Sequence, residues 1–431
     1  MRFLIPLLLF PAVVQAAPLE RSVDAYLAPL RKIDAFQGVV LVARGDRVEL
    51  RKAYGLANVE LGVPNTPDRV FRVASLSKPF TEVALGTLVD AGKLALTDPL
   101  SKWLPGFPSG DSITVDMIRT HRAGIPSRNS IPYDEESIVP NTLDSLVRAI
   151  AAMPLDFRPG ARTRYSNGGY AVLALVIEKA SGERYPAYMR RAVFEPLGLK
   201  STRHEGDGDL IANRAFGYMT DPSAVHGLVP APYQQMATKT GGGSLVSTVD
   251  DLDRFLRAFH HSPVLRPETW NALFPPDTLE AFQGRCPGFN VVMQRDYAHD
   301  LDVIVLANNY SAGMVGTIAD DMLAMALGEA RKPPEWRADV PLDTSSSSLV
   351  GSWRLEQPGP PLGPEPVRFE RRGDALIAVL GGRPVDALLP QGGGRYLSRT
   401  MWSEIVAAGD SLTLRPLWLE RPPARLVRVT P

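Results

Sequence analysis

Strand-forming segments lie near both ends of residues 17–331, and a long helical region separates them. The first two segments flank Gly45-Asp46, a pair typical of a β-hairpin turn. Strand pairs that flank helices in this way favour one antiparallel sheet built from both ends of a domain. We therefore expect an α/β fold with such a sheet. The strand-forming segments are residues 38–43, 47–54, 290–293 and 301–307.

The region between the strand pairs, residues 75–259, predicts helices joined by loops. Further helices are expected before the first strand pair and after the second. The clearest helical segments are residues 22–34, 143–153, 168–180, 186–193, 250–259 and 317–330.

A change of composition at Lys332 predicts a second domain. The chain has 431 residues, more than one core usually holds. Residues 332–348 are rich in Pro and Ser and predict a linker. Residues 349–431 contain no lysine, many Gly and Pro, and short apolar runs, so we expect a small β-rich, barrel-like domain. Stabilising the chain is its first expected role, ahead of covering the active site or binding a partner.

The N-terminus has the three zones of a secretory signal peptide. Arg2 precedes an apolar run over residues 3–14, and Gln15-Ala16-Ala17 follows it, with Val14 and Ala16 as the small residues before the cleavage site. We expect cleavage after Ala16, which makes residues 1–16 the signal peptide and the mature protein secreted or periplasmic. A retained membrane anchor is the alternative, although the run is short for a span. No membrane span is expected after cleavage.

Composition excludes several classes of function. The formal net charge of zero gives no general attraction to nucleic acid or to acidic lipid. Cys286 is the only cysteine, so an internal disulfide and a cysteine-based metal cluster are both impossible. The six histidines are scattered and contain no HExxH pattern. We therefore expect neither a metal nor another cofactor.

Ser75 and Lys78 form a Ser-x-x-Lys pattern at the start of an apolar helix. A serine hydroxyl needs a neighbouring base, and a lysine three residues later lies one helical turn above it on the same face. Burial would lower the pKa of that lysine and let it act as the base. Pro79 is tolerated only in a first turn, so the helix should begin at about Ser75, with the positive end of its dipole at the hydroxyl.

The same four residues also fit an ordinary capped helix with a solvated lysine. The residues that follow favour burial instead, because they make most of the helix surface apolar. They include Val83, Ala84, Leu85, Leu88 and Val89.

Tyr165 and Asn167 supply a further pair of polar groups. A phenol can donate and accept a proton, so Tyr165 paired with Lys78 can relay one near neutral pH. The alternative is structural: Tyr165 packs in the core, and Asn167 caps the helix that follows.

Residues 71–79 resemble the nucleophile segment of class C β-lactamases, penicillin-binding proteins and their esterase relatives. The resemblance spans about residues 20–330, with its motifs in order. It implies a β-lactamase/transpeptidase-like fold, in which an α/β domain lies beside an all-helical lobe and the active site lies between them. Residues 349–353 resemble the first strand of barrel modules in some members. The other matching motifs are residues 113–114, 120–126, 157–160, 165–170, 196–199 and 242–248.

The resemblance implies a role for each candidate residue. Ser75 is the expected nucleophile and Lys78 its base. Tyr165 is expected to shuttle a proton between nucleophile and leaving group, and Asn167 to orient substrate and lysine. His121 corresponds to a structural histidine in the family.

The third motif of the family has two candidate positions. Lys239-Thr240-Gly241 is literally K-T-G, but it runs into further glycines and a helix N-cap pattern rather than a strand. Alignment favours residues 282–284, with Phe282, Gln283 and Gly284 in the motif. Gly284 would allow close approach of the substrate. The N–H of Arg285, with that of Ser75, would form the oxyanion hole.

These observations predict a secreted serine hydrolase that cleaves ester or amide bonds through an acyl-enzyme. Phe282 stands where β-lactamases and peptidases carry a cation, so we expect esterase-like activity on uncharged substrates, unless Arg285 restores the charge. A D-alanyl peptidase, a D-amino acid amidase and a β-lactamase are alternatives. An inactive relative that binds penicillin or peptidoglycan is an alternative of another class.

Overall fold

The structure is a computed structural model of the 431-residue chain. The predicted signal peptide lies outside the described residues. These residues are 18–127, 142–206, 208–224, 227–258, 262–275, 279–310, 314–332, 335–337, 339–342, 344–356, 365–400, 402–408, 411–417 and 422–429.

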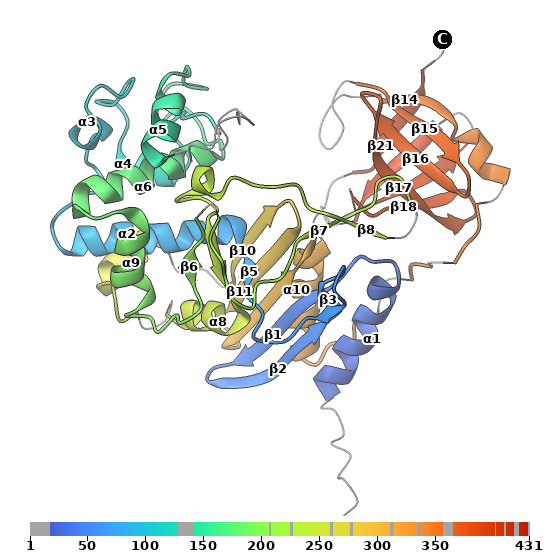
Figure 1. Cartoon of the computed structure of the whole chain (residues 1–431), viewed down its shortest axis with the longest axis horizontal. Helices are drawn as coiled ribbons and strands as arrows, with labels where there is room; N and C mark the ends of the chain where they lie inside the picture. The colour runs from blue at the N-terminus through green and yellow to red at the C-terminus, as the bar shows by residue number, and fades with distance from the viewer. Residues whose placement is uncertain are drawn as a thin grey trace, which may run out of the picture.

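A five-stranded sheet joins the two strand pairs, in the order β10-β11-β12-β1-β2 (Figure 1). Strand β1 runs antiparallel to β12, from Gly38 opposite Ala307 to Arg44 opposite Leu301. The prediction of one antiparallel sheet built from both ends of the domain is therefore confirmed. The strands are β1 (Gly38–Arg44), β2 (Arg47–Tyr54), β10 (Leu279–Cys286), β11 (Phe289–Asp296) and β12 (Leu301–Ala307).

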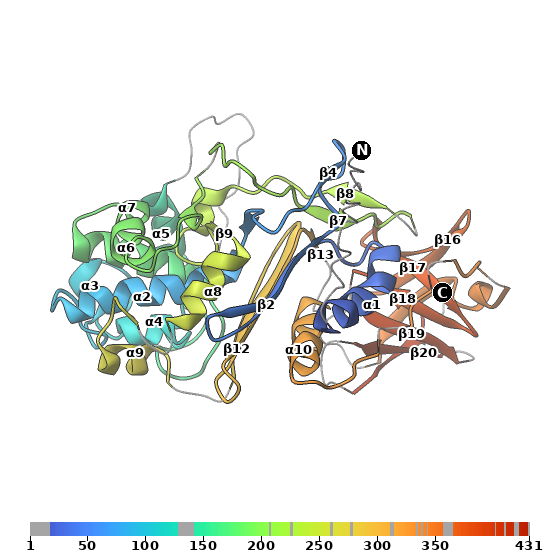
Figure 2. The same ribbon diagram turned by 90° about the horizontal axis from the view of Figure 1, so that it is seen from below.

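Alternating side chains of the sheet enter two different hydrophobic cores, as the pleat of a strand requires. Val40 and Val42 pack with helices α1 (Pro18–Lys32) and α10 (Met314–Ala326) on one face. Val39 and Leu41 enter the core shared with the helical lobe on the other face. Figure 2 shows the resulting layers, with the helical lobe on one side of the sheet and α1 and α10 on the other.

The helical lobe is built around α2 and α6, which are apolar around most of their surface. In α6 every residue from Gly168 to Ile177 is buried. In the second half of the lobe, α7 continues directly into a π-helical turn at Arg190–Phe194. The helices are α2 (Ser77–Asp90), α3 (Leu100–Trp103), α4 (Val115–Arg119), α5 (Leu143–Ala151), α6 (Asn167–Ser181), α7 (Tyr185–Met189), α8 (Val249–Arg257) and α9 (Pro267–Leu273).

The prediction that residues 75–259 contain only helices and loops is wrong, because short strands run through this part of the chain. β9 pairs with both β5 and β6, and this brings the residues before Ser75 beside those that follow Gly243. β7 pairs with β8 and with β13, on the side of the first domain that faces the C-terminal domain. The short strands are β3 (Leu56–Asn58), β4 (Val63–Pro64), β5 (Phe71–Arg72), β6 (Arg203–His204), β7 (Tyr218–Thr220), β8 (Leu228–Pro230), β9 (Leu245–Ser247) and β13 (Asn309–Tyr310).

The C-terminal domain is a closed antiparallel barrel, so the expected small β-domain is confirmed. Its interior is filled by Trp353, Phe369, Tyr396 and aliphatic side chains. The strands are β14 (Gly351–Leu355), β15 (Val367–Arg372), β16 (Ala375–Leu380), β17 (Arg383–Gly392), β18 (Arg395–Ser398), β19 (Ser403–Ala408), β20 (Ser411–Pro416) and β21 (Ala424–Arg428).

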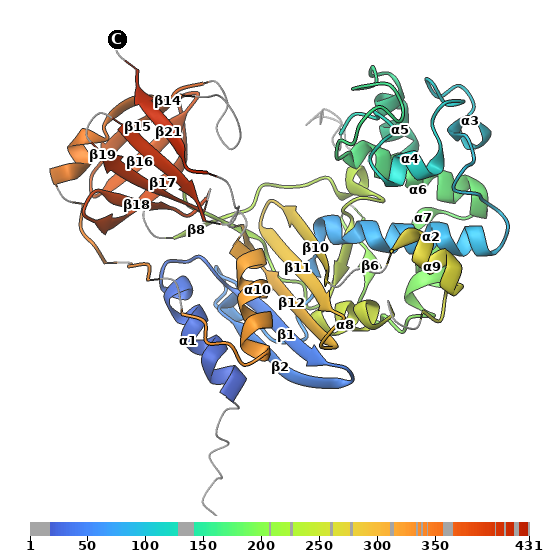
Figure 3. The same cartoon turned by 180° about the vertical axis from the view of Figure 1, so that it is seen from behind.

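The barrel packs against the α1 and α10 side of the first domain (Figure 3). Trp402 joins the hydrophobic core of that side, and the buried Arg399 donates to the backbone carbonyls of Ile33 and Ala224, each at 3.1 Å. Trp336, in the predicted linker, meets Trp402 edge-on with ring centroids 6.2 Å apart. The described part of this segment is therefore packed against the rest of the protein, unlike a flexible linker. The predicted domain boundaries stay predictions.

Candidate active site

Ser75 lies in a 3₁₀ turn, Ala74–Leu76, that leads directly into α2. The sequence predicted the helix start at Ser75, and regular α-helix begins two residues later at Ser77. Ala74 has a φ of +46°, a conformation that a residue with a Cβ adopts at a cost. Ser77 stabilises the turn, because its hydroxyl donates to Ala74 O at 2.7 Å and accepts from the Leu245 N–H at 3.1 Å.

Lys78 is buried, with 5% of its surface exposed, and its amine is the hub of the site. Nζ lies 3.1 Å from Ser75 Oγ, 2.9 Å from Asn167 Oδ1 and 2.8 Å from the Gly242 carbonyl oxygen. Burial lowers the pKa of Lys78 to about 7. A lysine with such a pKa is partly uncharged at neutral pH, so it can accept a proton from the serine.

Tyr165 lies on the other side of the serine hydroxyl. Its Oη is 2.8 Å from Ser75 Oγ, and its ring centroid is 4.7 Å from Lys78 Nζ. Burial raises the pKa of Tyr165, so the phenol is protonated at neutral pH. The structure thus brings Ser75, Lys78, Tyr165 and Asn167 together, as the sequence predicted for these four residues.

Ser166, rather than Asn167, caps α6. Its Oγ accepts from the Gly169 N–H at 2.9 Å. Asn167 is the first residue of the helix, and its side chain faces Lys78. The structural alternative for Asn167 is therefore wrong, because the cap is one residue earlier.

His121 supports the backbone beside Tyr165. Its Nδ1 accepts from the Ser166 N–H at 3.2 Å, and its ring lies 4.7 Å from the Tyr165 ring and 5.4 Å from that of Tyr170. Burial lowers the pKa of His121 to about 4, so the ring is neutral at pH 7. The acceptor nitrogen of His121 is used by a backbone amide, and its ring packs against two tyrosine rings. These are the contacts of a structural residue.

Strand β10 passes directly beside the Ser75 turn, and Gly284 makes this contact possible. A Cβ at Gly284 would lie 2.3 Å from Val73 O and 3.1 Å from Ser75 N. No side chain fits there, so the glycine allows one backbone to approach another. The literal triplet Lys239-Thr240-Gly241 lies instead at a 3₁₀ helix (Met236–Lys239), so it cannot be a strand motif.

The side chains next to Gly284 on β10 contact other parts of the protein. Phe282 packs against the core and meets Phe274 edge-on at 6.5 Å. The Arg285 guanidinium donates to Tyr310 Oη at 2.5 Å, which holds its charge against that residue. Gln283 donates from its amide to Asn290 Oδ1 at 3.3 Å. Arg285 therefore does not restore the missing charge at Phe282.

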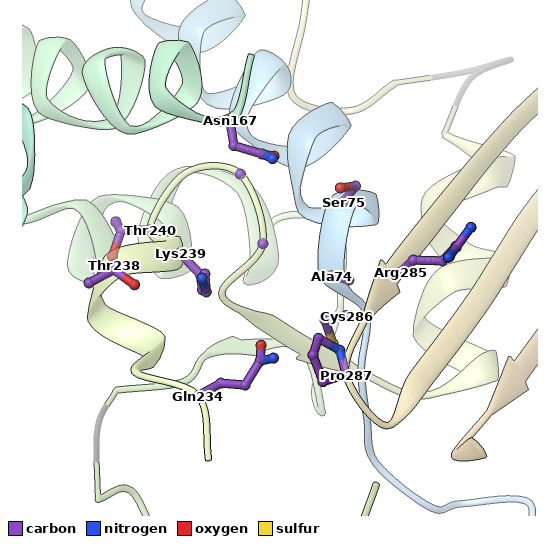
Figure 4. A pocket seen from close by; sticks show the side chains of 12 residues that line it. Ala74, Ser75, Asn167, Gln234, Thr238, Lys239, Thr240, Arg285, Cys286 and Pro287 are labelled. Carbon is purple, nitrogen blue, oxygen red and sulfur yellow. The ribbon is translucent and has the colours of Figure 1, made fainter. Parts of the chain in front are cut away.

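A pocket of about 300 Å³ opens beside Ser75 (Figure 4). Phe282 is not among its lining residues, so the ring gives this pocket no apolar wall. No sequence pattern pointed to Gln234, and Lys239 stood out only as part of the literal K-T-G triplet. Both side chains extend into the pocket in Figure 4. The lining residues are Ala74, Ser75, Asn167, Gln234, Thr238, Lys239, Thr240, Gly242, Gly243, Arg285, Cys286 and Pro287.

Comparison with known proteins agrees with this arrangement. The Beta-lactamase family model matches residues 23–299, more than half of the chain. The chain belongs to the Beta-lactamase family, together with penicillin-binding proteins, esterases and amidases of the same fold.

Two curated relatives illustrate the range of this family. Esterase EstB of Burkholderia gladioli is 30% identical, over 59% of this chain and 72% of that protein. Penicillin-binding protein 4* of Bacillus subtilis (strain 168) is 29% identical, over 60% of each chain. The match thus spans only 60% of the length of the latter protein.

Solved structures share the fold at lower identity. D-amino acid amidase from Ochrobactrum anthropi SV3 superposes with a TM-score of 0.63 at 23% identity, covering 72% of this chain and 99% of that one. An octameric penicillin-binding protein homologue from Pyrococcus abyssi gives a TM-score of 0.62 at 22% identity and covers 96% of this chain and 100% of that one.

Proposed function

We propose that the protein is a secreted serine hydrolase of the class C β-lactamase type, which cleaves ester or amide bonds through an acyl-enzyme at Ser75. The carrying observation is the position of Ser75 Oγ, 3.1 Å from a buried lysine amine and 2.8 Å from a tyrosine hydroxyl. A serine needs such a base to act as a nucleophile. A protein that only binds its ligand does not need such a base.

Acylation begins when Ser75 Oγ attacks the substrate carbonyl carbon and its proton passes to the neutral amine of Lys78. A neutral amine has two hydrogens and one lone pair. It can donate to Asn167 Oδ1 and the Gly242 carbonyl while the lone pair faces the serine. When the tetrahedral intermediate collapses, the leaving group takes a proton from Tyr165, which regains one from Lys78. Water then attacks the ester of Ser75 with the same groups in reverse, and the serine is regenerated.

The register of the β10–β11 hairpin supports an oxyanion hole formed by the N–H groups of Ser75 and Arg285. Cys286 pairs with Phe289 across a two-residue turn, and a pair in that position exchanges backbone hydrogen bonds. The next pair, Arg285 with Asn290, then directs its N–H and C=O groups away from β11. Since β10 is an edge strand, the Arg285 N–H faces the side on which Gly284 meets Ser75.

Esters are the proposed preferred substrates. The relatives support hydrolase activity, but they do not distinguish ester from amide bonds. The similar proteins include an esterase, a teichoic acid D-alanine hydrolase of Staphylococcus aureus and a D-amino acid amidase. A panel of p-nitrophenyl esters, D-amino acid amides, D-alanyl peptides and a cephalosporin tests the proposal. Turnover of none of them, with no acylated protein in the mass spectrum, would favour the inactive binding relative.

Secretion is proposed from the N-terminal sequence, where Arg2, the apolar residues 3–14 and Ala16 fit a signal peptide. In the part of the chain that the structure describes, no helix has the length and apolar character that crossing a bilayer requires. N-terminal sequencing of protein exported by a bacterial host tests the cleavage after Ala16.

His121→Asn should lower the acylation rate per folded molecule by less than about tenfold, whereas loss of a general base costs roughly 10²–10⁴-fold. The asparagine can still accept from the Ser166 N–H, and His121 transfers no proton in the proposed mechanism. Stopped-flow acylation, normalised to the folded fraction, measures the effect. A loss of more than 10²-fold in well-folded protein would indicate a histidine-based mechanism.

Phe282→Lys should raise kcat/KM for substrates with a carboxylate on the leaving group, by about 1–3 kcal/mol of charge-assisted hydrogen bonding. It should lower activity on neutral esters. Phe282 lies on β10, two residues before Gly284, so a lysine there adds a cation close to the nucleophile turn. Phe282→Met, which also removes the ring but adds no charge, is the matched control. Wild-type turnover of a cephalosporin as fast as that of a p-nitrophenyl ester would show this interpretation of Phe282 to be wrong.

A further inference from the structure

The pocket beside Ser75 contains a lysine that the proposed mechanism does not use. Lys239 is half-buried, and its side chain extends into the pocket in Figure 4, which Gln234 also lines. The pocket lining contains two cationic residues, Lys239 and Arg285, and no carboxylate. Any role of this pocket in substrate binding rests on the proposed function, since the pocket would receive one part of the substrate that Ser75 attacks.

The position of the pocket along β10 places it on one side of the reacting carbonyl. Gly284 lies against the Ser75 turn, and the strand continues towards Cys286 and Pro287, which line the pocket. Phe282 lies in the opposite direction along the strand. Tyr165, the proposed proton donor to the leaving group, is not among the lining residues. The leaving group is thus expected at Tyr165, and the acyl group in the pocket.

Hydrogen bonds link the backbone of Lys239 to the turn that also contacts Lys78. The N–H groups of Gly242 and Gly243 both donate to the Lys239 carbonyl, at 3.1 Å and 2.8 Å. Gly242 in turn accepts from Lys78 through its own carbonyl, at 2.8 Å. One turn therefore connects the backbone of Lys239 to the amine of Lys78.

Other polar groups near the pocket form hydrogen bonds within the protein. The hydroxyls of Thr238 and Thr240 donate to backbone carbonyls of their own turn, each at 2.8 Å. The nearby carboxylate of Glu205 is buried and neutralised by a bidentate pair with Arg72, at 2.7 and 2.8 Å, and by Arg214. An ammonium has three N–H donors, and Lys239 lines the pocket together with Gln234, so both side chains are placed to meet a polar acyl chain.

We propose that Lys239 binds a carboxylate at the far end of the acyl group, with Gln234 as a second hydrogen-bond donor. The substrates of this class are half-esters or half-amides of short dicarboxylic acids. A pocket of about 300 Å³ is at the small end of ligand sites, which fits an acyl chain of a few carbons. The acyl end of the substrate is then anionic, while the leaving-group end, towards Phe282, is uncharged.

Two p-nitrophenyl esters of equal chain length test the proposal, the half-ester of adipic acid and the hexanoate. They differ only in a terminal carboxylate in place of a methyl group. Wild-type protein should prefer the adipyl ester, and Lys239→Met should lower the adipyl-to-hexanoyl ratio of kcat/KM by roughly 10–100-fold, mainly through KM. Lys179→Met, which removes an exposed lysine from α6, is the control and should leave the ratio unchanged.

The outcomes separate this inference from the proposed function. If neither ester acylates Ser75 in the wild-type protein, the proposed function itself is wrong. If both are hydrolysed and Lys239→Met lowers both rates equally, only the assignment of the acyl carboxylate is overturned. Should Lys239→Met fail to fold, the wild-type ratio decides, because a preference for the hexanoate contradicts an anion site in this pocket.

Discussion

Ser75→Ala should lower kcat/KM for p-nitrophenyl esters by about 10⁴-fold or more, as losses of a catalytic nucleophile do. The Ser75 hydroxyl contacts both the Lys78 amine and the Tyr165 phenol and can form an acyl-enzyme, and alanine removes it without adding bulk. The remaining activity would come from binding and the oxyanion hole. Active-site titration with a fluorophosphonate and steady-state kinetics measure the loss.

Ser112→Ala is the matched control for this variant. Ser112 is exposed and lies in the turn before α4, so its hydroxyl should contribute nothing to turnover. Equal melting temperatures for the two variants would show that Ser75→Ala remains folded. Normal activity of Ser75→Ala would reject the proposed nucleophile, and loss of activity in Ser112→Ala would indicate another one.

Lys78→Met should reduce acylation almost as much as Ser75→Ala, because members of one catalytic unit fail together rather than additively. Methionine has a similar length and suits the buried site, so folding should survive, although Asn167 and the Gly242 carbonyl lose a donor. The double variant should be no slower than either single one. Acylation by a fluorophosphonate at a rate close to wild type in folded Lys78→Met protein would exclude Lys78 as the base.

The pH dependence of acylation gives a second test of Lys78. The proposed base is the neutral amine of Lys78, and its fraction grows as pH rises through the lowered pKa of about 7. The acylation rate should therefore rise through about pH 7 and level off above it, and this limb should vanish in Lys78→Met. A single limb near pH 4 would report the lowered pKa of His121 instead and contradict the assignment.

The sheet and the main helices were predictable because their apolar periodicity extends over many residues. β1 and β12, for example, are buried along almost their whole length. β5, β6 and β9 were missed because strands of two or three residues are too short to show an alternating pattern. The cap of α6 was displaced by one residue, since Ser166 and Asn167 are equally suited to that position.

The proposed catalytic residues were predictable because local spacing sets much of their geometry. Ser75 and Lys78 lie one turn apart on one helix start, and the Tyr165 and Asn167 pair begins another. Lys239 could not be placed in this way, because tertiary packing alone brings it to a serine more than 160 residues earlier in the chain. Its literal K-T-G pattern was rightly rejected as a strand motif, yet the residue still lines the pocket.

The position of the Phe282 ring could not be predicted from the sequence for a similar reason. The sequence showed that the cation of the family motif is absent, but not that the ring packs against Phe274. The position of a side chain relative to a pocket depends on which neighbours fill the space around it. Here the neighbour is Phe274, which lies at the C-terminal end of α9 and not on β10.

The most direct test of the account is peptide mass spectrometry of the protein after reaction with a fluorophosphonate and, separately, with a p-nitrophenyl ester. We expect one added phosphonyl or acyl group, located on Ser75. The labelling rate should rise through about pH 7 as Lys78 loses its proton. Labelling of Ser77, Ser112 or another residue, or no label on a folded protein that still hydrolyses the ester, would contradict it.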